Sequence, residues 1–124
     1  MRLFLLLILS FCFSAIQAQN STFESSLSTA NTALLSSYFD GKLELSTPSA
    51  KGVYSKQQAK VILDQFFQKN IPNKYTYKHD GGSKERSLYE IGKLECQKDT
   101  FRTYILYNLV EGKPQIIELR IEKE

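Results

Sequence analysis

Residues 100–122 read TFRTYILYNLVEGKPQIIELRIE, and this stretch decides the fold class because its pattern is that of a β-hairpin. Two runs, 100–110 and 115–122, are rich in β-branched and aromatic residues that alternate with a period of two. The step Gly112-Lys113 between the runs predicts a tight turn. The stretch therefore predicts two long antiparallel strands.

The residues before this hairpin extend the strand pattern. Runs with a period of two at 74–79 and 87–97 predict two more strands, and a tight turn at 98–99 would join the second to the hairpin. A short alternating strand, KLELS, is predicted at 42–46, and residues 48–52 are expected to form a loop.

Helical patterns come first in the chain. In STFESSLSTANTALLSSYFD, residues 21–40, Ser21 and Glu24 are spaced as a capping box at the start of a helix. The apolar residues that follow recur at spacings of three and four, which predicts one buried stripe made of Phe23, Leu27, Ala30, Leu34 and Tyr38.

A second helix is predicted within GVYSKQQAKVILDQFFQKN, residues 52–70. Ser55 and Gln58 form its capping box, and it should end near Asn70 because Pro72 follows. Its expected buried stripe is Ala59, Ile62, Leu63 and Phe66.

Helices followed by a run of hairpins define an α+β fold, with two N-terminal helices packed on a curved antiparallel sheet. Residues 19–124 provide enough chain for one domain with one core.

The first eighteen residues, MRLFLLLILSFCFSAIQA, match a secretory signal peptide with a cleavage site near Ala18. We therefore expect an exported protein, periplasmic or extracellular. The apolar run is shorter than the roughly 20 residues that span a bilayer, so no membrane span is expected in the mature chain.

The composition argues against several classes of function. The formal net charge is +3 with charges interspersed, so no nucleic-acid or membrane patch is expected. The two cysteines are Cys12, inside the signal peptide, and Cys96, so no internal disulfide is expected in the mature chain. A zinc site needs several Cys or His ligands, and the mature chain would contain only Cys96 and His79. We therefore expect no metal site and no cofactor.

The stretch HDGGSKER, residues 79–86, contains the only histidine and two adjacent glycines. A phosphate-binding loop needs the order GxxxxGK[ST] followed by a helix, and this stretch has neither. It is interpreted as a loop between strands. His79 is in phase with Tyr75 and Tyr77, so the three are expected on one face, where His79 is either a hydrogen-bonded rim residue or a polar group at a pocket mouth.

A two-residue turn at Gly112-Lys113 would pair Tyr104 with Ile121 and would divide the strands into two faces. The face expected to meet the helices carries Tyr89, Ile91, Arg102, Tyr104, Leu106, Asn108, Ile117, Leu119 and Ile121. Arg102 would then point inward and need a partner, either Glu95 or an anionic ligand.

The opposite face would carry Leu88, Leu94, Cys96, Ile105, Tyr107, Leu109 and Ile116 together with Glu90, Glu118 and Arg120. Such an apolar face is typical of a surface that meets a partner, and a symmetric dimer is the commonest solution.

The segments GVYSKQQAKVILDQFF, HDGGSKERSLYEIGKL, TFRTYILY and IIELRIEKE, with the signal peptide, resemble a family of small exported Bacteroidota proteins known as domain of unknown function 4783. The resemblance implies the nuclear-transport-factor-2-like, cystatin-like fold, in which a curved sheet and helices form a cone. Enzymes of that superfamily, such as ketosteroid isomerase and scytalone dehydratase, place Asp or His bases and Tyr donors inside the cone. No inward Asp is expected in a strand here, and fold alone does not carry function across.

Three functions follow as hypotheses. The first is a non-catalytic module that binds a small molecule in the cone, with Tyr77, His79, Tyr89, Arg102 and Tyr104 as its ligand-binding residues. The second is a homodimeric interaction or structural protein that uses the outer sheet face. The third is a lyase-like or isomerase-like enzyme with His79 as general base, which lacks an evident orienting carboxylate.

Overall fold

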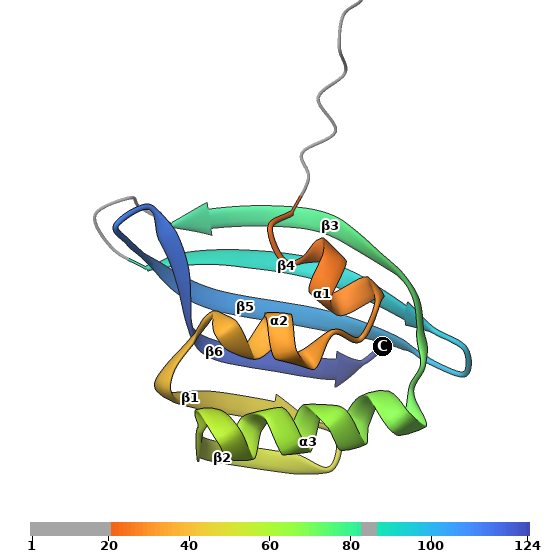
Figure 1. Ribbon diagram of the computed structural model, residues 1–124. Helices are drawn as coiled ribbons and strands as arrows, with labels where there is room; N and C mark the ends of the chain where they lie inside the picture. The colour runs from red at the N-terminus through yellow and green to blue at the C-terminus, as the bar shows by residue number, and fades with distance from the viewer. Residues whose placement is uncertain (1–20, 83–86) are drawn as a thin grey trace, which may run out of the picture.

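The computed structural model describes residues 21–82 and 87–124; the expected signal peptide and residues 83–86 of the HDGGSKER stretch lie outside them. Within these residues, six strands form one curved sheet in the order β2-β1-β6-β5-β4-β3, with helices on one side (Figure 1). The elements are α1 (Glu24–Ser28), α2 (Thr32–Ser37), β1 (Phe39–Thr47), β2 (Ala50–Ser55), α3 (Lys56–Lys69), β3 (Pro72–Gly82), β4 (Leu88–Cys96), β5 (Thr100–Val110) and β6 (Lys113–Lys123).

The expected α+β architecture is confirmed. Every strand pair is antiparallel except β1 with β6, which is parallel. Helix α1 packs on β3, and α3 packs on α2, β1 and β2. We call the helix-covered side of the sheet, which carries Leu45, Leu94 and Ile105, the inner face, and the opposite side the outer face.

The N-terminal helix expected over residues 21–40 is instead two short helices. The chain breaks between them at Ala30, whose φ is 53°, and the Asn31 side chain then caps α2 by accepting a hydrogen bond from the Leu34 amide at 3.1 Å. Serine and threonine side chains compete for backbone groups and weaken a helix, which explains the break in this Ser- and Thr-rich segment. The capping box expected at Ser21 and Glu24 is also wrong, because α1 has no side-chain cap.

Helix α3 forms as the sequence predicts. Ser55 accepts a hydrogen bond from the Gln58 amide at 3.2 Å, and the Gln58 side chain accepts one from the Ser55 amide, so the capping box is confirmed. The helix ends at Lys69 with Asn70 as its C-cap. Its buried side chains are Ala59, Leu63, Phe66 and Phe67, whereas Ile62 is half-buried.

Strand β2 replaces the loop expected at residues 48–52. It pairs with β1 in a tight hairpin, with Thr47 opposite Ala50 and Leu43 opposite Tyr54. This strand lies at the edge of the sheet and buries few side chains. Apolar and polar residues therefore alternate only weakly in AKGVYS, and the sequence pattern does not predict a strand there.

The β5–β6 hairpin corrects the expected inner face. The turn consists of Glu111 and Gly112, both with positive φ (53° and 76°). Beyond the turn, Tyr107 pairs with Ile116 but Leu106 pairs with Glu118, so Ile117 has no partner on β5. This β-bulge inserts one residue, and a shift of one residue exchanges the faces.

The bulge places Leu119 and Ile121 on the same side as Ile105 and Phe101 rather than with Tyr104. The sequence correctly predicts which side chains of β4 and β5 share a face. The face that meets the helices, however, is the opposite one. Tyr89, Ile91, Arg102, Tyr104 and Leu106 lie on the outer face, and Leu94, Phe101, Thr103, Ile105 and Tyr107 on the inner face.

A second bulge, in β3, changes the position of His79. Tyr77 pairs with Gly92 and His79 pairs with Ile91, so Lys78 has no partner on β4. His79 therefore does not share a face with Tyr75 and Tyr77, as its phase in the sequence predicts. It lies on the outer face, and Asp80 turns to the inner face, opposite Glu90.

Replacing the N-cap residue of α3 tests how much the capping hydrogen bond contributes to the stability of the protein. The substitution Ser55→Ala removes an N-cap hydrogen bond and should lower the free energy of unfolding by about 1 kcal/mol, measured by urea denaturation. Ser49→Ala, at an exposed position in the β1–β2 turn, is the control and should have little effect. Equal stability of the two variants would contradict the assigned cap.

Candidate functional site

Four outer-face side chains form a continuous row across strands β3 to β6, which we call the aromatic row: His79, Tyr89, Tyr104 and Arg120. The Tyr89 and Tyr104 rings are nearly parallel, 19° apart, with centroids separated by 6.0 Å. The Arg120 guanidinium lies 4.2 Å from the Tyr104 centroid. At the other end, His79 Nε2 is 3.2 Å from the Tyr89 hydroxyl.

The sheet register explains why these side chains meet. Tyr104 lies directly opposite Arg120 on β6, and it is a diagonal neighbour of Tyr89 because Ile91 is its partner on β4. Since β4 and β6 flank β5 on opposite sides, Tyr89 and Arg120 cover opposite sides of the Tyr104 ring. The row therefore presents ring edges and hydroxyl groups, rather than free ring faces, to a partner.

Charged residues surround the row. Arg120 Nε lies 2.9 Å from Glu118 Oε1, and Lys93 Nζ lies 3.8 Å from Glu95 Oε1. Arg102 is exposed and pairs with Lys93 on β4, not with Glu95, which lies opposite Thr100. The expected pairing of Arg102 with Glu95 is therefore wrong, because the turn between β4 and β5 is longer than two residues. The expected inward direction of Arg102 is wrong too, because the bulge in β6 makes the opposite face the inner one.

Gly81 gives the glycine pair of HDGGSKER a structural role. Gly81 pairs with Tyr89, and a Cβ atom at position 81 would overlap the Tyr89 ring. The next residue, Gly82, has a φ of 100°, a conformation that side chains disfavour. The first glycine thus makes space for the aromatic row, and the second allows the chain to turn.

The predicted residue Tyr77 stays on the inner face, beside a polar cluster centred on Glu90. Glu90 Oε2 accepts hydrogen bonds from the Ser21 hydroxyl and the Tyr75 hydroxyl, each at 2.5 Å. The carboxyl group is buried, and Asp80 is its partner across β3. Gly92 makes this cluster possible, because a Cβ atom there would overlap the Tyr75 ring.

Burial dominates the electrostatics of the cluster. Burial raises the pKa of Glu90 above its usual range; the hydrogen bonds from Ser21 and Tyr75 oppose that shift, and the charges of Asp80 and Glu24 add to it. Desolvation and the neighbouring Asp80 carboxylate raise the pKa of Tyr77 to about 12. Burial and the Glu90 charge also raise the pKa of Tyr75, which keeps this phenol a hydrogen-bond donor.

Apolar side chains fill the space between the helices and the inner face. The largest of the fully buried ones, each at most 2% exposed, are Phe23, Leu27, Leu35, Leu43, Leu45, Leu63, Leu94, Ile105, Ile116, Leu119 and Ile121.

 Phe66 and Phe101 meet edge to face at 5.0 Å and add to the same core. Within the described residues, the interior of the cone is therefore largely occupied by the protein's own side chains.

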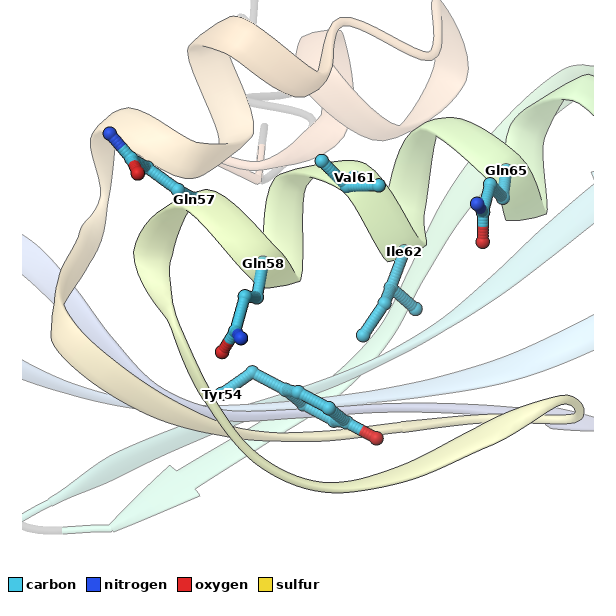
Figure 2. A pocket seen from close by; sticks show the side chains of 6 residues that line it. All are labelled: Tyr54, Gln57, Gln58, Val61, Ile62 and Gln65. Carbon is cyan, nitrogen blue, oxygen red and sulfur yellow. The ribbon is translucent and has the colours of Figure 1, made fainter.

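A groove of about 450 Å³ lies elsewhere, between α3 and the edge strand β2. Figure 2 shows Gln58 and Ile62 of α3 pointing toward the Tyr54 ring. Gln57, Val61 and Gln65 complete its lining, so the groove offers amides and one phenol but no charged group. It lies apart from the aromatic row and from the Glu90 cluster.

His79 and Cys96 are not brought together. His79 lies on the outer face, whereas Cys96 is a buried free thiol on the inner side of β4. Burial and the nearby Asp99 raise the pKa of Cys96 to about 11, so the thiol stays protonated at neutral pH. Among the described residues, no three His, Cys, Asp or Glu side chains are placed to hold a metal ion.

The structure adds residues that sequence reasoning missed. Asp80 and Glu90 face each other on the inner side, and the phase of β3 hid this because Lys78 is bulged. Ser21 was interpreted as a helix cap, yet it binds Glu90, which is 69 residues away in the chain. A long-range contact of this kind leaves no local signal in a sequence.

Solved structures with this fold come from several bacteria. A DUF4783 family protein from Bacteroides ovatus is 24% identical, with a TM-score of 0.76 over 85% of this chain and 94% of that one. An NTF2-like protein from Anabaena variabilis is 12% identical, with a TM-score of 0.61 over 82% of this chain and 81% of that one. A protein with a cystatin-like fold from Nostoc punctiforme is 13% identical, with a TM-score of 0.56 over 82% of this chain and 83% of that one. These likenesses establish an NTF2-like, cystatin-like fold.

The family follows from the sequence match. The family described as Domain of unknown function (DUF4783) matches residues 20–122, and the chain belongs to it. The resemblance seen in the sequence is thereby confirmed. No curated protein matches the chain. No helix among the described residues is long and apolar enough to cross a membrane.

The contact between Gly81 and Tyr89 can be tested directly. Gly81→Ala should displace the Tyr89 ring, because the added methyl group takes its place, and so break the stacking on Tyr104. Nuclear Overhauser effects between the two rings should disappear. Gly41→Ala is the matched control, because a Cβ atom at Gly41 meets nothing within 4 Å. Persistence of the ring contacts in Gly81→Ala would show that the row is built differently.

Proposed function

We propose that the protein is an exported, non-catalytic interaction module that self-associates through the outer face of its sheet. The aromatic row carries this proposal. It runs from the edge strand β3 to β6 on the side opposite the helices, and Tyr89 and Tyr104 are half-exposed within it. Export is inferred from the signal peptide expected at residues 1–18.

The residues around the row are those that protein interfaces favour. Tyr89 pairs with Leu106 and Ile91 pairs with Tyr104, which gives a half-exposed block of two aromatic and two aliphatic side chains. Tyrosine and arginine are enriched at interface hot spots, and Arg120 lies against this block. Covering the block would remove apolar surface from water, and this supplies a driving force for association.

The charges on the same face favour a second copy of the chain as the partner. Basic and acidic side chains are interspersed around the block: Lys93, Arg102 and Arg120 with Glu95, Glu118 and Glu122. Two contacts, Lys93 with Glu95 and Arg120 with Glu118, already join opposite charges within the chain. A two-fold interface requires a self-complementary surface, and a face of mixed charge meets that requirement better than a face of one sign.

A small-molecule ligand is the second candidate, and the Glu90 cluster favours it. Tyr77, Asp80 and Glu90 bring polar groups together at the inner face, where the superfamily places its ligands. Of the five residues predicted to bind a ligand, Tyr77 is the one on this face. The other four lie on the outer face: His79, Tyr89, Arg102 and Tyr104. A ligand that they bind would therefore lie on that side of the sheet, and their part in ligand binding stays a prediction.

Self-association can be tested at the centre of the row. Tyr104→Asp places a charge in the proposed interface and should weaken association at least about tenfold, because hot-spot substitutions cost about 2 kcal/mol or more. Size-exclusion chromatography with light scattering over a range of concentrations measures the change.

Val61→Asp is the matched control. Val61 is 54% exposed on α3, away from the outer face, so this variant should associate like the wild type. A wild-type protein that remains monomeric at high concentration would overturn the proposal, and so would equal weakening by the two variants.

Native mass spectrometry separates the two candidate functions. The protein is purified from its own host and measured first under gentle and then under denaturing conditions. Self-association predicts a dimer mass with no additional component. A molecule that is lost on denaturation would instead support the ligand function, and Tyr77→Phe should then reduce its occupancy.

A further inference from the structure

We propose that Glu90 is a proton-controlled latch that holds α1 against the sheet while its carboxyl group is protonated and loosens α1 when the group ionises. This inference is independent of the proposed self-association, because the latch lies on the inner face. It concerns the segment that closes one side of the core.

A hydrogen bond joins the start of the helical layer to the sheet. The Ser21 hydroxyl donates to Glu90 Oε2 at 2.5 Å and also accepts a hydrogen bond from the Phe23 amide at 3.0 Å. Phe23, 1% exposed, then packs edge to face on Tyr38 and Tyr107, with centroids 5.3 Å away in each case. Ser21 therefore ties the position of the Phe23 ring to the Glu90 carboxyl group.

The surroundings of Glu90 oppose a negative charge. Its side chain is buried, at 5% exposure, and the titratable groups that act on it are Glu24 on α1 with Tyr75 and Asp80 on β3. Tyr107 on β5 lies near enough that its own pKa is raised by Glu90. Two of these groups are carboxylates and none is a cation. Among the described residues, an ionised Glu90 thus has two hydroxyl donors but no opposite charge to offset its lost hydration.

The direction of the pH effect follows from the burial of Glu90 beside other acidic groups. Because the pKa of Glu90 is raised when α1 is in place, the closed arrangement is most stable at acidic pH and loses stability as the pH rises through the raised pKa. Moving α1 gives the carboxylate access to water. This helix has only five residues and begins next to Ser21, so it is the nearest element that can move without separating strands.

Hydrogen exchange on the purified protein tests the latch. The reporter is the Leu27 amide, which is bonded to the Phe23 carbonyl at 3.0 Å, and the reference is the Ile105 amide in the centre of β5. Protection factors are compared at about pH 5 and about pH 8, which removes the intrinsic effect of pH on exchange. The Leu27 protection factor should fall about tenfold for each unit by which the Glu90 pKa is raised, while Ile105 stays the better protected amide at both pH values.

Variants assign the effect to one carboxyl group. Glu90→Gln should abolish the fall at Leu27, whereas Glu95→Gln, a half-buried outer-face control, should leave it unchanged. Asp80→Asn removes one neighbouring charge and should make the fall smaller, which tests the latch even if Glu90→Gln does not fold. An unchanged fall in Asp80→Asn, or no fall in the wild type, would overturn the proposal. Equal protection of Leu27 and Ile105 would do so too, because exchange would then report global unfolding rather than release of α1.

Discussion

One extra residue in β6 determines which side chains form the core. Ile117 has no partner on β5, and this bulge turns Leu119 and Ile121 to the side of Ile105. The inner face then becomes apolar enough to hold the helices, and the aromatic row is left on the outer face. Without the bulge, Leu119 and Ile121 would share a face with Tyr104, and neither side of the sheet would carry a continuous apolar surface. The core, the aromatic row and the position of the helices all depend on this one insertion.

Two glycines let tyrosines lie flat on opposite faces of the same pair of strands. On the inner face, Tyr75 of β3 lies over Gly92 of β4; on the outer face, Tyr89 of β4 lies over Gly81 of β3. The strands thus exchange roles between the two faces. The neighbours Tyr89 and Glu90 belong to different groups, because adjacent residues of a strand point to opposite sides. A short stretch of β4 therefore serves both the aromatic row and the α1 contact.

Local signals in the sequence predicted local structure well. The strand at Thr100–Val110 and the capping box of α3 are confirmed, because each depends on residues close together in the chain. The failures share a cause: a bulge adds a residue without a distinctive sequence, and both Ile117 and Lys78 fit an unbroken alternation. Four of the five predicted site residues do lie on one face, with three of them in the aromatic row, but on the side opposite to the one expected. The Ser21–Glu90 contact could not be predicted, since no local pattern records a partner 69 residues away.

The order of strands has a consequence for how the chain can fold. β6 follows every other element in the described sequence, yet it lies between β1 and β5 in the sheet (Figure 1). Until β6 is in place, the β1–β2 hairpin and the β3–β4–β5 meander have no backbone hydrogen bonds to each other. Contacts between distant parts of a chain slow folding, and here the element that joins the two halves is synthesised last. The apolar inner face therefore becomes continuous only after β6, the last of the described strands, has left the ribosome.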